Sequence, residues 1–177
     1  MELAIRNKWV SFRGSSVVKD TAENDVMKVQ GKFFSFTAKK FIQTLDGETK
    51  YIVRNKFWRL FIHRAFVLAP DGKEVIANIR RKFWSVHDHY FIQSKYGEIE
   101  IRGNILCFNY NIKLNGKDVG HVARKISIRD SFVLTIDDDQ EDIYFWVALV
   151  IAIDNITDQR TNENIEASNS SSTYYGS

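Results

Sequence analysis

The sequence predicts a mainly β fold, a closed antiparallel barrel of about twelve strands around one buried apolar helix near the C-terminus. Three observations lead to this prediction: a repeat that returns every 22 to 26 residues, an alternation of apolar and polar side chains before each copy, and eleven consecutive apolar residues at 143–153. Repeated units that each present one apolar face must pack side by side to bury it. A hydrophobic content of 44% in 177 residues is sufficient for one such core.

The repeat consists of a lysine followed by a bulky apolar residue. Its copies are Lys8-Trp9, Lys32-Phe33, Lys56-Phe57, Lys82-Phe83 and Lys125-Ile126, with Asn104-Ile105 as a degenerate copy. Recurrence at a nearly constant spacing indicates repeated structural units. The chain is therefore predicted to contain six units.

Side chains before each copy alternate with a period of two, which is typical of a strand whose two faces meet different surroundings. One face carries no charge in any unit, and it comprises Leu3, Ile5, Met27, Val29, Tyr51, Val53, Ala77, Ile79, Ile99, Ile101, Gly120 and Val122. The opposite face is polar and mostly basic, and it comprises Arg6, Lys8, Gln30, Lys32, Arg54, Lys56, Arg80, Lys82, Arg102, Asn104, Ala123 and Lys125. A shift of one residue would place the charges inside, so the register is strongly specified.

Turn residues divide each unit into a pair of strands. Asp46-Gly47, Asp71-Gly72 and Asn115-Gly116 precede strands and accept the positive φ angles of tight turns, and Pro70 suits the second of them. A second β-branched or aromatic stretch follows the repeat lysines, as at Val17-Val18, Phe41-Ile42, Phe66-Val67, Phe91-Ile92 and Phe132-Val133. Six pairs give twelve strands.

The apolar run at 143–153, flanked by Asp142 and Asp154, predicts a helix over about 142–156. Eleven helical residues span about 16 Å, which is too short to cross a bilayer core of about 30 Å. A helix that is apolar on every side must be enclosed, and a barrel of twelve strands has room for one slender helix. The five acidic residues within 137–142 are predicted to cap this helix. A calcium or magnesium site there is the less favoured alternative, because the run lacks the spacing of a calcium loop.

The charges and the single cysteine suggest a compartment and a partner. Residues 1–136 hold 24 basic and 13 acidic side chains, although the net charge of the chain is only +3. A cationic strand region is compatible with contact to phosphates or to an anionic membrane surface. Cys107 cannot form a disulfide within the chain and is expected in the core, and the first residues lack the apolar run of a secretion signal. We therefore expect a cytoplasmic protein, peripheral to the membrane if it binds lipid.

The repeat and the helix together resemble the LURP-one-related family, which shares the tubby C-terminal-like fold. The resemblance rests on Lys32-Phe33-Phe34-Ser35-Phe36, on the Lys-Phe-Trp copies at Lys56 and Lys82, and on residues 148–154. It implies a twelve-stranded barrel around a C-terminal helix over residues 1–156. The stretch 157–177 has no place in the family pattern, and its polar, low-complexity composition predicts a disordered tail. Tubby proteins bind phosphoinositide head groups and the related phospholipid scramblases act at membranes, so the resemblance also implies binding of lipid or of a partner. No lipid-binding motif matches residue by residue.

The basic positions of the repeat are the candidate site for an anionic ligand. Closure of the barrel would bring them together in a band, which consists of Arg6, Lys8, Lys32, Arg54, Lys56, Arg80, Lys82 and Arg102. Such a band could bind the phosphates of lipid or nucleic acid, or it could serve only solubility. The sequence favours a non-enzymatic binding or scaffold module without a cofactor. Nucleic acid is the less favoured ligand, because exposed stacking aromatics cannot be distinguished from core aromatics.

An enzyme is the alternative from a different class. His87, Asp88 and His89 are the local cluster that could bind a metal, since His87 and His89 would share one face of a strand and Cys107 could complete a zinc site. Two surface histidines are the simpler interpretation. The sequence contains neither a Gly-x-Ser-x-Gly motif nor a glycine-rich phosphate loop, so no catalytic residues are assigned.

Overall fold

The computed structural model describes residues 1–6, 15–31, 39–56, 64–81, 88–125 and 131–172. Within these ranges twelve strands form one antiparallel sheet that closes into a barrel, because β1 pairs with both β2 and β12. The strands are β1 (Glu2–Arg6), β2 (Ser15–Asp20), β3 (Asp25–Gly31), β4 (Lys40–Gln43), β5 (Thr49–Lys56), β6 (Arg64–Leu68), β7 (Val75–Arg81), β8 (Asp88–Ser94), β9 (Gly97–Asn104), β10 (Asn109–Leu114), β11 (Lys117–Lys125) and β12 (Ser131–Ile136). The predicted twelve-stranded barrel is therefore confirmed.

The predicted two faces of the strands are also confirmed. The uncharged face points into the barrel, where its side chains are at most 7% exposed, and only Gly120, which has no side chain, is of intermediate exposure. On the opposite face Gln30, Arg80, Arg102 and Asn104 are exposed to solvent, and Arg54 is partly exposed. Alternation along the six odd-numbered strands therefore fixes which residues line the interior.

The tight turns lie where the sequence predicts them. Asn115 and Gly116 join β10 to β11 with φ angles of 50° and 83°, the pair of positive angles that a two-residue hairpin turn requires. Gly47 and Gly72 have φ angles of 93° and 72° in the turns before β5 and β7. These turns pin the register of three hairpins.

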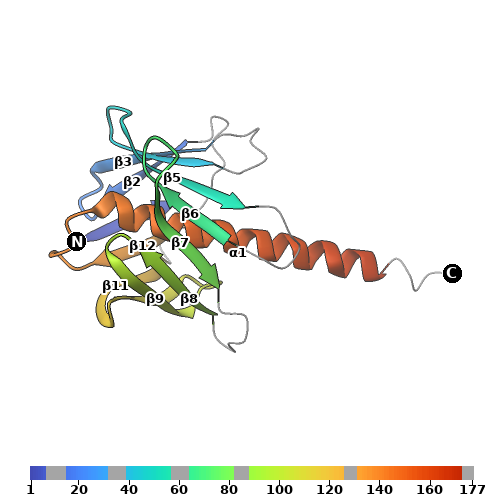
Figure 1. Cartoon of the computed structure of the whole chain (residues 1–177). Coiled ribbons are helices and arrows are strands. Elements are labelled where there is room, and N and C mark those ends of the chain that lie inside the picture. The colour runs from blue at the N-terminus through green and yellow to red at the C-terminus, as the bar shows by residue number, and fades with distance from the viewer. Residues whose placement is uncertain (7–14, 32–38, 57–63, 82–87, 126–130, 173–177) are drawn as a thin grey trace.

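One helix, α1 (Ile143–Ser172), runs through the barrel and leaves it at the end away from the N-terminus (Figure 1). Its residues from Phe145 to Ile153 are at most 2% exposed. Within the barrel α1 lies against β5 and β6 and touches β4 and β7 less extensively. The apolar run is thus enclosed from Phe145 onward, as predicted, while Ile143 and Tyr144 at its start are partly buried.

Polar groups hold both ends of the enclosed segment. Asp142 caps the N-terminus, because its Oδ1 accepts a hydrogen bond of 3.0 Å from the backbone N–H of Phe145. Near the other end Asn155 Nδ2 donates to Asn55 Oδ1 of β5 at 3.5 Å. The position of the helix along the barrel axis is therefore fixed from both ends.

The helix is longer than the sequence predicts. It continues to Ser172 through residues where a disordered tail is expected, and the predicted boundary at 156 corresponds to the last buried turn instead. Once the enclosed turns are formed, each further residue adds to an existing helix without a new nucleation step. No glycine or proline interrupts residues 143–172, so nothing in the sequence stops this extension.

Candidate functional site

The barrel has two different ends, which we name by the course of α1. The entry end, where α1 begins, carries the turns before β5, β7 and β11 and the segment 137–142. The exit end, where α1 leaves, is reached by the last residues of the odd-numbered strands (Figure 1). The predicted basic positions that lie on described strands, Arg6, Arg54, Lys56, Arg80 and Arg102, stand near those last residues and so belong to the exit end.

Four basic residues on β5, β6 and β7 lie together on the outer wall at the exit end. The register places Lys56 opposite Arg64, and Arg64 opposite Arg80. Side chains directly opposite one another on neighbouring antiparallel strands have Cβ atoms about 4.5–5.5 Å apart. The register therefore places these three positions in a lateral row, for Lys56 by its backbone alone, and we call this row together with Arg54 the basic patch.

Arg54 is held against the wall by an aromatic ring. Its guanidinium carbon lies 5.9 Å from the ring centroid of Phe66 on β6, within the range of a cation–π interaction. Among the residues that the structure describes, no acidic side chain forms an ion pair with Arg54, Arg64 or Arg80.

Arg102 differs from the basic patch because its charge is paired. Its Nη2 and Nε donate to Glu100 Oε1 at 2.7 Å and 3.0 Å, and His89 Nε2 lies 2.6 Å from the same oxygen. Burial raises the pKa of Glu100, but hydrogen bonds from Arg102 and His89 outweigh burial and hold this pKa below its ordinary value. Glu100 is thus ionised at neutral pH and neutralises Arg102.

The alternative metal cluster is only partly described. His89 is 9% exposed and packs on the Phe91 ring with 4.3 Å between centroids. For Asp88 the structure describes the backbone only, and His87 lies outside the described residues. Across the described part of the chain, no three His, Cys, Asp or Glu side chains are grouped to hold a metal ion. The hydrogen bond to Glu100 gives His89 a structural role.

The expectation for Cys107 is wrong. Its side chain is exposed in the turn between β9 and β10. The repeat is degenerate at Asn104-Ile105, and β9 ends there, so the alternation of the strand does not continue to Cys107. Leu106 beside it is 52% exposed for the same reason.

Comparison with known proteins identifies the family. A family model described as LURP-one-related matches residues 1–154, which include every strand and the enclosed part of α1. The chain belongs to the LURP-one-related family. No curated protein matches it in sequence.

The fold of this LURP-one-related chain is also found in a solved structure. An X-ray structure of a protein from Arabidopsis thaliana matches with a TM-score of 0.62 and 18% sequence identity, over 88% of this chain and 90% of the other. At this identity the match concerns the fold alone. Among the described residues, no helix has the length and apolar character that a membrane span requires.

The structure brings together some of the predicted basic residues and adds one. Arg54 and Arg80 lie in the basic patch with Lys56, whose backbone alone is described, as is that of Arg6. Lys8, Lys32 and Lys82 lie outside the described residues. Arg64 was missed because the repeat draws attention to the odd-numbered strands. The alternation of Ala65-Phe66-Val67 could have indicated Arg64, because it places Arg64 on the same outer face as Phe66.

Proposed function

We propose that this LURP-one-related barrel is a non-catalytic binding module that attaches to anionic phospholipid membranes through the basic patch. The observation that supports this most is the lateral row formed by Lys56, Arg64 and Arg80. Like charges directly opposite one another destabilise a sheet. No acid among the described residues pairs with Arg64 or Arg80, so an external anion is the natural partner.

The chemistry of a membrane surface suits this arrangement. Anionic lipids attract each nearby lysine or arginine by about 1 kcal/mol, and the attraction falls off within a Debye length. A flat row on an outer wall can meet many head groups without a deep pocket. Tubby-like barrels are typically binding domains, which agrees with the family assignment. Attachment would be peripheral and reversible.

Vesicle sedimentation tests the proposal. We expect the chain to sediment with vesicles that contain phosphatidylserine and not with pure phosphatidylcholine, and added salt should weaken the binding. Replacing two cations, as in Arg64→Gln with Arg80→Gln, should weaken it by about 2 kcal/mol, or about thirtyfold. The matched control is Lys73→Gln with Lys117→Gln, which removes the same charge at the entry end and should change binding much less.

Two results would contradict the proposal. Binding that does not depend on the anionic lipid content would exclude the membrane as the partner. An equal loss in the patch variant and in the control would show that only the net charge matters. Gel shifts with single-stranded RNA provide the comparison with nucleic acid, and tighter, patch-dependent binding of RNA would replace lipid as the ligand.

A further inference from the structure

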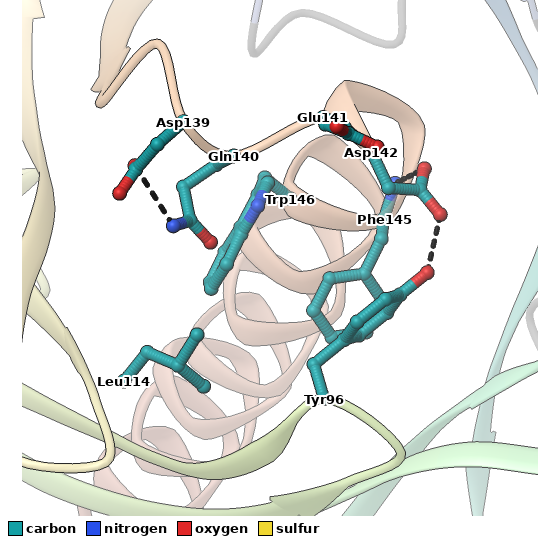
Figure 2. A pocket seen from close by; sticks show the side chains of 8 residues that line it. All are labelled: Tyr96, Leu114, Asp139, Gln140, Glu141, Asp142, Phe145 and Trp146. Carbon is teal, nitrogen blue, oxygen red and sulfur yellow. Dashed lines mark hydrogen bonds between the residues drawn. The ribbon is translucent and has the colours of Figure 1, made fainter.

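A pocket of about 450 Å³ opens at the entry end, beside the first turn of α1 (Figure 2). Three aromatic rings, those of Tyr96, Phe145 and Trp146, contribute to its wall. The segment 139–142 forms its rim and contributes three carboxylates and an amide. The pocket is on the opposite end of the barrel from the basic patch and has the opposite charge.

The aromatic wall is held in place by hydrogen bonds and ring packing. Tyr96 donates to Asp142 Oδ2 at 2.5 Å, and Tyr51 donates to the same oxygen. The rings of Tyr96 and Phe145 have centroids 4.6 Å apart, and those of Phe145 and Trp146 are 5.2 Å apart. The ring faces are therefore positioned before any ligand arrives, which reduces the entropy lost on binding.

Ammonium groups of the chain itself are already drawn to this site. Lys95 Nζ lies 5.0 Å from the centroid of the Tyr96 ring. Lys117 Nζ lies 3.4 Å from Asp139 Oδ2 at the rim. Aromatic faces and carboxylates both attract cations. The surroundings of the pocket thus favour a positively charged ligand.

The side chain of Trp146 indicates what else the ligand must carry. Trp146 is 2% exposed and lines the pocket, and Figure 2 shows its indole between Gln140 and the first turn of the helix. Within the described part of the chain, no acceptor receives a hydrogen bond from its indole N–H. This N–H is not one of the fully buried polar atoms that lack a partner, so it is accessible within the pocket, where a ligand oxygen would accept its hydrogen bond in place of water.

We propose that this pocket binds a small organic ammonium compound that carries a hydroxyl or carbonyl oxygen close to its nitrogen. The cation lies against the aromatic wall of Tyr96, Phe145 and Trp146 near Glu141, and the oxygen accepts a hydrogen bond from Trp146. This inference is independent of the proposed function, since it concerns the other end of the barrel and a ligand of opposite charge.

Nuclear magnetic resonance titration of the full chain tests the proposal. The indole N–H resonance of Trp146 is followed, and the spectrum of Trp146→Phe assigns it. Choline is the probe for a quaternary ammonium group and ethanolamine is the probe for a primary one. The probe that binds more tightly shows which kind of ammonium group the pocket prefers. 3,3-Dimethyl-1-butanol is the neutral analogue of choline and should bind about tenfold more weakly. Tetramethylammonium lacks the oxygen and should bind about fivefold more weakly.

Two variants at Tyr96 separate the ring from the hydroxyl. Tyr96→Phe and Tyr96→Leu both lose the hydrogen bond to Asp142, but only Tyr96→Leu loses the aromatic face. Choline should therefore bind Tyr96→Phe at least about fivefold more tightly than it binds Tyr96→Leu. Trp146→Phe lacks the indole resonance, so binding to this variant is measured by the broadening of the ligand's own lines. In this variant the preference for choline over tetramethylammonium should disappear.

Three results would overturn the inference. If neither ammonium compound gave a saturating shift in the millimolar range, the pocket would not bind this class. Equal affinity for choline and its neutral analogue would leave only an apolar cavity. Equal affinity for choline and tetramethylammonium in the unaltered chain would remove the role of the indole.

Discussion

The two ends of the barrel treat polar groups in different ways. At the entry end Asp142 accepts hydrogen bonds from the Phe145 backbone and from the hydroxyls of Tyr51 and Tyr96. At the exit end Arg64 lies between Lys56 and Arg80 without an acidic partner among the described residues. The Asp142 carboxylate is satisfied by groups of the chain itself, whereas the basic patch lacks an acidic partner among the described residues.

This difference distinguishes the Asp142 cluster, which stabilises the fold, from the basic patch, which does not. Cooperative hydrogen bonds and caps stabilise the fold where α1 begins, while charges that oppose one another stabilise nothing by themselves. Residues that disfavour the fold they belong to are often retained for function. Substitutions at the two ends should therefore differ in the sign of their effect on stability, and the following predictions test that contrast.

The largest effect is expected for Phe145→Ala at the entry end. Phe145 is fully buried and its ring packs against Tyr51, Tyr96 and Trp146. Removing a buried phenyl ring leaves a cavity, and the free energy of unfolding should fall by about 3–5 kcal/mol. Urea denaturation followed by circular dichroism measures this change. Leu106→Ala in an exposed turn is the control, with an expected change within about 0.5 kcal/mol.

The second effect concerns the carboxylate that organises the entry end. Asp142→Ala removes the helix cap and the acceptor of two tyrosine hydroxyls, so the free energy of unfolding should fall by about 2–3 kcal/mol. Asp142→Asn keeps an oxygen that can cap Phe145 and should lose about half as much. If the two variants were equally stable, the charge and the tyrosine bonds would contribute nothing.

Alternation along single strands made the interior predictable from the sequence. Leu3 and Ile5 in β1 have counterparts in each later odd-numbered strand, and burial on one face is a property that each strand shows by itself. The enclosed helix was predictable for the same reason, because a run that is apolar on all sides can only be buried. The length of α1 was not, since propagation beyond Ile156 depends on turns that only burial makes stable.

Contacts between distant strands could not be predicted in the same way. The row formed by Lys56, Arg64 and Arg80 depends on the register between β5, β6 and β7, which shifts at Val67/Leu68. Likewise, Tyr51 and Tyr96 meet Asp142 although they lie 91 and 46 residues away from it in the sequence. Such groupings follow from closure of the barrel, which no local pattern specifies.

The third prediction is a dependence on alkaline pH that originates at the entry end. Burial, and then the hydrogen bond to Asp142, raise the pKa of Tyr51 above its ordinary value. Below about pH 10 the tyrosine is neutral in both the folded and the unfolded chain, and its stabilising contribution is complete. Above about pH 10 the unfolded chain releases the proton more readily, so the free energy of unfolding falls as the pH rises.

Tyr51→Phe should remove part of that dependence. At pH 7 the variant should be less stable by about 1 kcal/mol, because a hydrogen bond is lost. Above about pH 10 its stability should fall less steeply than that of the unaltered chain, by about 1 kcal/mol per pH unit. Urea denaturation at several alkaline pH values measures both slopes. Parallel slopes would show that Tyr51 ionises equally in both states.

The smallest effect is expected at the exit end, and it has the opposite sign. Arg64→Gln with Arg80→Gln relieves the opposition of like charges in the row, so the free energy of unfolding should rise by about 0.2–1 kcal/mol. Thermal denaturation at low ionic strength measures the gain, and salt should reduce it because it screens the same repulsion. Arg102→Gln is the control that breaks an existing ion pair with Glu100 and should lower stability slightly. A basic patch that gained stability while it lost binding to anionic vesicles would show that these charges are retained for a ligand, whereas a loss of stability in the double variant would mean that they serve the fold.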